Sequence, residues 1–123
     1  MKLAVIGSRG YTDLESLVEI LDVFWENDPS LEIISGGATG ADAFVQAWAE
    51  CNKVPCTVIR ANWAEYGKAA GYIRNGEIWD LAEAGVAFWD GESKGTAHSF
   101  KLAKKRGKTL VVINYVTGKL EEI

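Results

Sequence analysis

The sequence contains few of the residues that bind metals or form disulfides. Its 123 residues include two cysteines, Cys51 and Cys56, and one histidine, His98. The cysteine spacing matches neither a zinc site nor a disulfide framework, and one histidine is too few to complete a metal centre. We therefore expect no metal and no cofactor. Both thiols are expected to pack as small hydrophobic groups in a reducing cytoplasm.

Long apolar runs and an excess of basic residues are also absent. The run over residues 1–7 is too short for a signal peptide, and no segment approaches the ~20 apolar residues of a membrane span. Thirteen Lys and Arg against 17 Asp and Glu give a net charge of -4, whereas proteins that neutralise nucleic-acid phosphates usually carry a basic excess. We expect a soluble cytoplasmic protein with no membrane partner, for which nucleic acid is disfavoured.

The composition and the pattern of apolar residues predict one α/β domain over residues 1–123. The chain is 48% hydrophobic and 24% charged, which is typical of one compact domain with a core. Short apolar runs alternate with segments of helical period, as in a parallel sheet covered on both faces. The predicted strands are 3–6, 32–34, 57–59, 86–89 and 110–113.

Four helices are predicted between these strands. The first begins after Asp13, a plausible N-cap, and is closed by Pro29. The second follows Gly40, and the other two span about 68–83 and 96–106. The prediction is a Rossmann-like, doubly wound, five-stranded parallel sheet of order 3-2-1-4-5, with 2-1-3-4-5 as the competitor. Residues 114–123 are ambiguous, and Thr117-Gly118 could turn a short hairpin.

Polar, glycine-rich segments follow three of the predicted strands. Ligands of open α/β sheets bind beyond the carboxyl ends of the strands, so these segments are expected to share one crevice. Glycines let the backbone approach an anion, and a following helix presents free N–H groups. The candidate ligand-binding residues in these loops are Gly7, Ser8, Arg9, Ser35, Gly36, Gly37, Thr39, Gly40, Asp42, Asp90, Gly91, Ser93, Gly95 and Thr96.

Each of these features also has a purely structural explanation. The glycines could simply make tight turns, Arg9 could be a solvated side chain, and Asp42 could stabilise the first turn of its helix without any ligand. Two familiar phosphate motifs do not fit. Gly107-Lys108-Thr109 lacks the leading glycine of a P-loop, and Gly7-Ser8-Arg9-Gly10 lacks the spacing of the dinucleotide fingerprint.

The segment 62–75 adds candidates for the base side of a ligand. Trp63 and Tyr66 could stack on a base, and Lys68, Arg74 and Asn75 supply charge and hydrogen-bond donors. Core packing is the alternative for each aromatic residue, since five tryptophans in so small a chain cannot all contact a ligand.

These motifs, taken in order, resemble the small phage and bacterial branch of the SLOG superfamily, which unites the DNA-processing protein Smf/DprA with the LOG phosphoribohydrolases. The likeness spans residues 3–113 and rests on Gly7-Ser8-Arg9, Tyr11, Asp13, the run from Ser35 to Asp42, Trp63, Tyr66-Gly67-Lys68, Arg74-Asn75 and Gly95-Thr96. The resemblance implies a Rossmann-like fold that binds nucleotides or nucleotide-derived ligands, commonly as a dimer. It also implies that Arg74 matches an arginine of LOG enzymes, whereas Ser99 stands where those enzymes carry glutamate.

The leading hypothesis is a module that binds and senses, or sequesters, a nucleotide-derived small molecule. The phosphate would lie in the glycine loops, and the chain would form a homodimer or higher homo-oligomer. The first alternative is an N-glycosidase or phosphoribohydrolase with Arg74 and with Asp90 or Glu92 replacing the missing glutamate. The second alternative is a DprA-like DNA-associated protein.

Overall fold

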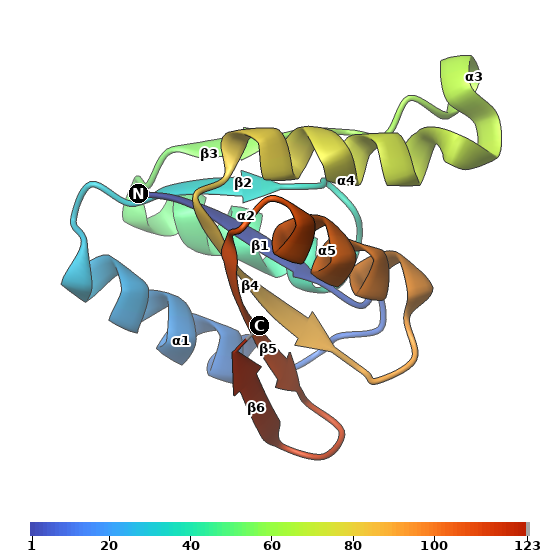
Figure 1. Cartoon of the computed structure of the whole chain (residues 1–123). Helices are drawn as coiled ribbons and strands as arrows, with labels where there is room; N and C mark the ends of the chain where they lie inside the picture. The colour runs from blue at the N-terminus through green and yellow to red at the C-terminus, as the bar shows by residue number, and fades with distance from the viewer. Residues whose placement is uncertain (123) are drawn as a thin grey trace.

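The computed structural model describes residues 1–122 and contains one six-stranded sheet (Figure 1). The strand order is β3-β2-β1-β4-β5-β6, which confirms the predicted order 3-2-1-4-5 for the first five strands. These five pair in parallel. The strands are β1 (Lys2–Gly7), β2 (Glu32–Ser35), β3 (Cys56–Val58), β4 (Ala84–Trp89), β5 (Thr109–Asn114) and β6 (Lys119–Glu122).

The sixth strand corrects the prediction of a five-stranded, all-parallel sheet. β6 pairs antiparallel with β5, so the sheet is mixed. The turn between them is closed by the amide of Gly118, which donates to the Asn114 carbonyl at 2.7 Å. All four residues of β6 are exposed, so the strand lacks the alternation of buried and exposed side chains by which strands are recognised in a sequence.

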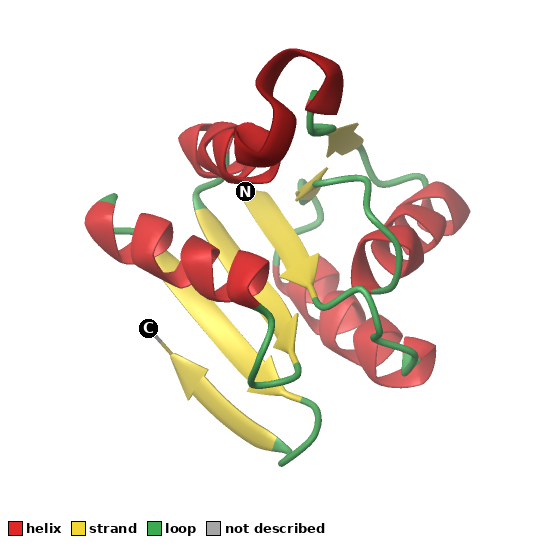
Figure 2. Ribbon diagram, turned by 90° about the vertical axis from the view of Figure 1, so that its right-hand side faces the viewer, coloured by secondary structure: helices red, strands yellow, loops and turns green. Residues whose placement is uncertain are grey.

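Helices cover both faces of the sheet (Figure 2). Apolar side chains alternate along the central strands, so each face has its own core. Leu3 and Val5 of β1 pack with the α1 and α2 side, whereas Ala4 and Ile6 pack with the α4 and α5 side. The helices are α1 (Leu14–Asn27), α2 (Ala41–Asn52), α3 (Trp63–Tyr66), the 3-10 turn η1 (Gly67–Ala69), α4 (Ala70–Leu81) and α5 (Lys94–Lys105).

Local signals in the sequence explain most of the helix boundaries. The Asp13 side chain accepts a hydrogen bond from the Ser16 amide, and α1 ends two residues before Pro29, as predicted. The helix predicted over about 68–83 is observed as the 3-10 turn η1 followed by α4, and the short helix α3 precedes it as an element that was not predicted. Asn62 caps the short helix α3 by accepting from the Glu65 amide. This cap defines the start of a short helix that the spacing of apolar residues in the sequence does not predict.

The two thiols differ in their exposure to solvent. Cys51 is exposed, which corrects the expectation that both cysteines are packed inside, and Cys56 is partly buried. Cys51 lies on α2, in the last turn of the helix.

Within residues 1–122, no helix is both long and apolar enough to cross a lipid bilayer.

Candidate functional site

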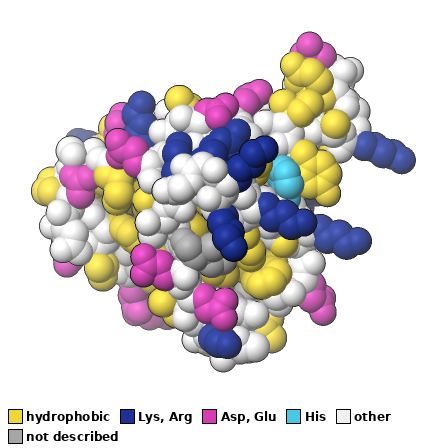
Figure 3. All heavy atoms as spheres, viewed as in Figure 1, with side chains coloured by type: hydrophobic (Ala, Val, Ile, Leu, Met, Phe, Trp, Pro, Cys, Tyr) yellow, Lys and Arg dark blue, Asp and Glu magenta, His cyan; other side chains and the backbone are white. Residues whose placement is uncertain are grey.

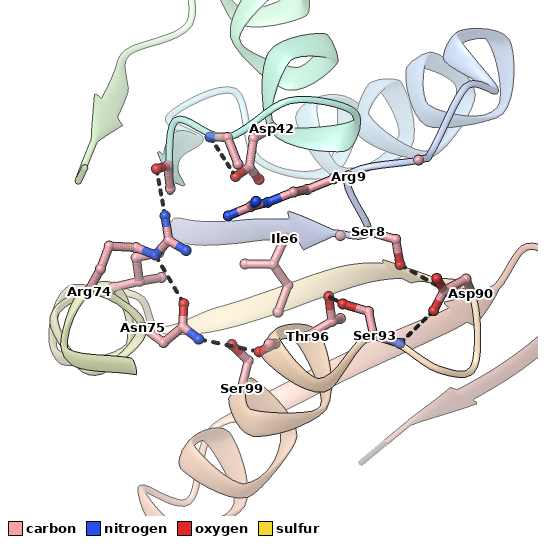
Figure 4. A pocket seen from close by; sticks show the side chains of 16 residues that line it. Ile6, Ser8, Arg9, Asp42, Arg74, Asn75, Asp90, Ser93, Thr96 and Ser99 are labelled. Atoms are coloured by element: carbon pink, nitrogen blue, oxygen red, sulfur yellow. Dashed lines mark hydrogen bonds between the residues drawn. The ribbon is translucent and has the colours of Figure 1, made fainter. Parts of the chain in front are cut away.

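A pocket of about 420 Å³ opens at the carboxyl edge of the sheet (Figure 4). It lies where β1 and β4 are neighbours and the chain connections diverge to opposite sides, which is the usual ligand position in such sheets. We call it the central pocket. It is lined by Ile6, Gly7, Ser8, Arg9, Gly10, Gly36, Ala38, Asp42, Arg74, Asn75, Ile78, Asp90, Ser93, Gly95, Thr96 and Ser99.

Glycines allow the loops after β1 and β2 to pack against each other beside this pocket. Gly40 has a φ of +71°, and a Cβ there would lie 2.5 Å from the backbone oxygen of Arg9. Gly36 serves a different contact, because a Cβ at this position would lie 2.8 Å from an Arg74 guanidinium nitrogen. The glycine at position 36 therefore leaves room for the guanidinium group against the loop backbone.

The wall formed by α4 is held by hydrogen bonds within the protein. Arg74 donates from Nη1 to the Gly36 carbonyl at 2.8 Å and from Nε to the Asn75 Oδ1 at 3.1 Å. Asn75 donates from Nδ2 to the Gly95 carbonyl at 3.3 Å. Burial lowers the pKa of Arg74, Asp42 opposes this shift, and Arg9 adds to it. A side chain from α4 therefore lies fixed in the pocket before any ligand enters.

Asp42 is a buried carboxylate with one unused oxygen. Its Oδ2 accepts a hydrogen bond from the Ala38 amide at 3.0 Å, whereas its Oδ1 is buried and has no hydrogen-bond partner among the described residues. Burial raises the pKa of Asp42, against the opposing effects of the Ala38 hydrogen bond and the positive charges of Arg74 and Arg9. A buried acceptor without a donor is costly, so this atom is a candidate to receive a hydrogen bond from a ligand.

The loop after β4 is shaped by Asp90. Its Oδ1 accepts from the amides of Glu92 at 2.8 Å and Ser93 at 2.7 Å, and these bonds lower the pKa of Asp90. The Asp90 amide in turn donates to the Ser8 Oγ at 3.1 Å, which ties this loop to the loop after β1 (Figure 4). The Asp90 carboxylate thus has a structural task in the turn that leads into α5.

The amino terminus of α5 faces the pocket and has no side-chain cap. Ser93 occupies the N-cap position but makes no capping hydrogen bond, and its Oγ lies 3.2 Å from the Thr96 Oγ1 instead. The first amides of a helix have no partner within the helix, and the helix dipole favours an anion at this end. Apart from the neighbouring residues and backbone of its own helix, no heavy atom of the described residues lies within 4 Å of the place where a Cβ of Gly95 would stand, so this face of the backbone is open to a ligand.

The amides of the glycine loop after β2 are largely engaged already. The Gly37 amide lies 3.4 Å from the Ser35 Oγ, and the Ala38 amide is bonded to Asp42. The carbonyls of this loop accept from arginines, since the Gly37 oxygen receives Arg60 Nη1 at 3.1 Å. Of the two loops that were expected to hold a phosphate, the one leading into α5 therefore offers the freer donors.

Several predicted binding residues lie outside the central pocket. Gly37, Thr39 and Trp63 line a neighbouring cavity together with Arg60, and Tyr66 lines another. The following predicted residues do not line the central pocket: Ser35, which is fully buried; Gly40, which packs against the loop after β1; and Lys68, Gly91 and Glu92, which are exposed.

Sequence reasoning missed some residues that line these cavities. Ile6 and Ile78 supply the apolar side of the central pocket, next to the buried Ser99, which the resemblance had already singled out as the position of the LOG glutamate. The sequence marks Ile6 only as a core residue, because nothing distinguishes a core side chain that borders a cavity from one that does not. Arg60 carries a usable signal: it stands two residues after β3, as Arg9 stands two residues after β1.

Comparison with known proteins identifies the family. A sequence model of the YspA, cpYpsA-related SLOG family matches residues 1–66. The chain is also 34% identical over 121 residues to the Gene 61 protein of Mycobacterium phage D29, covering 93% of this chain and 95% of that protein. The chain belongs to this SLOG family. The resemblance seen in the sequence motifs is thereby confirmed.

Two solved structures share the SLOG fold. One describes the unique single-stranded DNA binding mode of DNA processing protein A from Helicobacter pylori, with a TM-score of 0.71 and 22% identity over 91% of this chain. The other is DNA processing protein A from Streptococcus pneumoniae, with a TM-score of 0.74 and 20% identity over 90% of this chain. The chain spans 64% and 49% of those two chains, respectively.

These neighbours correct the prediction that nucleic acid is a disfavoured partner. The argument from net charge was wrong, because a protein of this fold is described as binding single-stranded DNA. Net charge also conceals how charges are distributed along this chain. Seven of the 13 Lys and Arg residues lie between Lys94 and Lys119, and no Asp or Glu lies between Ser93 and Leu120. A negative total is therefore compatible with a basic region.

Proposed function

We propose that the chain binds a nucleotide in the central pocket, with the phosphate at the amino terminus of α5. The observation that carries this proposal is that one pocket contains both a place for an anion and a place for a hydrogen-bond donor. The uncapped start of α5 and the Arg9 side chain favour the anion. The unpartnered Asp42 Oδ1 favours a hydroxyl or amino group.

The relative positions of these groups support a ligand with a phosphate and a polar sugar or base. In Figure 4, Arg9 extends across the pocket between Asp42 and Ile6, while Ser93 and Thr96 lie on the opposite side. Inorganic phosphate would satisfy the arginine and the helix end, but Asp42 lies on the other side of the pocket from Ser93 and Thr96. A nucleotide supplies both features, because its sugar hydroxyls or the N–H groups of its base can donate at a distance from its phosphate.

The first experiment compares ligands that carry one or both features. Melting temperature is measured with nucleoside 5′-monophosphates, the matching nucleosides and inorganic phosphate. A nucleotide at 100 times its Kd should stabilise the fold by about 2.7 kcal/mol, a readily measured shift for a chain of this size. We expect the largest shift with a nucleoside monophosphate. Equal shifts with inorganic phosphate, or no shift with any of these ligands, would contradict the proposal.

The second experiment removes the arginine. Arg9→Ala should weaken binding of the monophosphate more than binding of the nucleoside, because a guanidinium contact to phosphate is lost. Arg106→Ala is the matched control, since Arg106 lies at the end of α5 and pairs with Asp80 at 3.1 Å. Equal losses for monophosphate and nucleoside in Arg9→Ala would remove Arg9 from the site.

The same samples test whether a bound nucleotide is cleaved. Among the carboxylates proposed for a glycosidase, Asp90 borders the pocket and uses its Oδ1 for two amides, and Glu92 does not line the pocket. We therefore propose binding without hydrolysis. Chromatography should show no free base after prolonged incubation, and base release that disappears in Asp90→Ala would replace this proposal by the enzymatic one.

A further inference from the structure

A second cavity of about 410 Å³ lies between α4 and α5, next to the central pocket. We call it the side groove, and it is lined by Tyr72, Lys94, Ala97, His98 and Lys101. The side groove adjoins the central pocket through Lys94, which precedes Gly95, and through Asn75, whose Nδ2 lies 3.3 Å from the His98 Nδ1. A ligand that leaves the central pocket past the start of α5 would enter this groove.

The groove offers two aromatic rings to a ligand. Tyr72 and His98 meet edge to face, with centroids 4.5 Å apart and an angle of 70° between the rings. Tyr72 is 51% exposed, so part of its ring is free to stack on another flat group. Because the neighbouring Asn75 Nδ2 is a donor, His98 accepts at Nδ1 and carries its proton at Nε2. Burial and the charge of Lys101 lower the pKa of His98, which favours this neutral form.

The charge of the groove is entirely positive. Lys94 and Lys101 are both exposed, and no carboxylate is among the lining residues. Both lysines belong to the basic stretch that runs from Lys94 to Lys108 without an acidic residue. Figure 3 shows this clustering, with dark blue basic side chains gathered around the single cyan histidine and an adjoining hydrophobic surface.

We propose that the side groove binds the next nucleotide of a single-stranded nucleic acid whose phosphate occupies the central pocket. This inference rests on the proposed function. The aromatic rings suit an unpaired base, since stacking needs a free base face, and the two lysines suit the backbone phosphate that follows. A duplex would present paired bases that cannot reach Tyr72, and an acidic peptide would use the lysines but not the rings.

The first test varies ligand length and charge. Binding of thymidine 5′-monophosphate, dT2, dT4 and dT8 is measured by competition against fluorescein-labelled dT8. We expect dT2 to bind at least tenfold more tightly than the monophosphate. Lys94→Gln/Lys101→Gln should lose at least tenfold more affinity for dT8 than for the monophosphate. The magnitude of the slope of log K against log salt should fall by about 0.7, for the one backbone phosphate that the two lysines contact on a single strand.

Lys2→Gln/Lys53→Gln is the matched control, because it removes the same charge at the opposite edge of the sheet. Lys2 begins β1 and Lys53 precedes β3, and both are exposed. If this control loses as much affinity for dT8 as the groove variant, the effect is one of net charge and the inference is overturned. Competition by polyglutamate as strong as that by dT8 would also overturn it.

The second test addresses stacking. Tyr72→Leu should weaken dT8 binding about tenfold or more, whereas Tyr72→Phe should retain most of it, since only the ring is needed. If the monophosphate binds but dT8 binds no tighter, the side groove is excluded and the proposed function stands. If neither ligand binds, the proposed function itself fails.

Discussion

The amino termini of α1 and α5 lie at the same edge of the sheet, but only α1 has a side-chain cap. Asp13 caps α1 by accepting from the Ser16 amide at 3.1 Å and from the Ser16 hydroxyl at 2.7 Å. Ser93 makes no such bond for α5. Of these two helix starts, that of α5 borders the central pocket and that of α1 does not. A helix that is not capped by its own side chains forgoes some stability, and the difference marks α5, in contrast to α1, as a helix whose end is available to a ligand.

The largest expected effect comes from Asp42, the buried carboxylate that faces α5 across the pocket. Asp42→Asn can still accept from Ala38 through its amide oxygen, but it then turns a donor toward the ligand. Loss of a hydrogen bond to a charged group, about 1.5–3 kcal/mol, should weaken nucleotide binding about tenfold to a hundredfold. Calorimetric titration measures the loss, and unchanged affinity would show that Asp42 does not contact the ligand.

The same variant should respond differently to pH. Because burial raises the pKa of Asp42, the folded protein binds a proton more readily than the unfolded chain. In the wild type this contribution is present below the unfolded pKa and is lost as the pH rises through the raised folded pKa. Urea denaturation across that range should show the fall in the wild type and not in Asp42→Asn, which should be at least as stable as the wild type at pH 7.

An intermediate effect is expected when α5 is given the cap that α1 has. Ser93→Asp places a carboxylate at the N-cap position, which should raise the free energy of unfolding by about 0.5 kcal/mol. The same carboxylate would occupy the helix amides and repel a phosphate, so nucleotide affinity should fall about tenfold. Denaturation and titration of one sample measure both changes. Ser93→Thr is the uncharged control, and equal affinity losses in the two variants would argue against an anion at this helix end.

The smallest effect is expected when the cap of α1 is removed. Asp13→Ala should lower the free energy of unfolding by about 1 kcal/mol and leave nucleotide affinity unchanged, since Asp13 does not line the pocket. Chemical denaturation and titration measure the two quantities. A loss of affinity comparable with that of Ser93→Asp would remove the distinction between the two helix ends.

Much of this arrangement follows from local patterns in the sequence. Apolar runs and capping residues predicted the five parallel strands, their order and the start of α1. The position of polar residues after strands predicted that Ser8, Arg9, Gly36 and Gly95 would border one pocket. Those features depend on neighbours in the chain and on general rules of sheet winding, which the sequence displays directly.

Other features depend on contacts that the sequence does not display. The glycine loop after β2 turns carbonyls toward Arg74 and Arg60, and no motif distinguishes that orientation from one that presents amides. The short α3 depends on the Asn62 cap, and β6 depends on pairing with β5. The basic stretch of α5 was visible in the sequence but was hidden by averaging charge over the whole chain.

The fixed position of Arg74 has a consequence for the entropy of binding. Its Nε and Nη1 are held by Asn75 and Gly36, so its rotamer freedom is lost when the chain folds and not when a ligand arrives. Arg9, by contrast, is exposed and makes no side-chain hydrogen bond within the described residues. Ligand binding should therefore leave the α4 side of the pocket nearly unmoved. Immobilising the Arg9 side chain, by contrast, costs conformational entropy at the moment of binding and lowers the affinity.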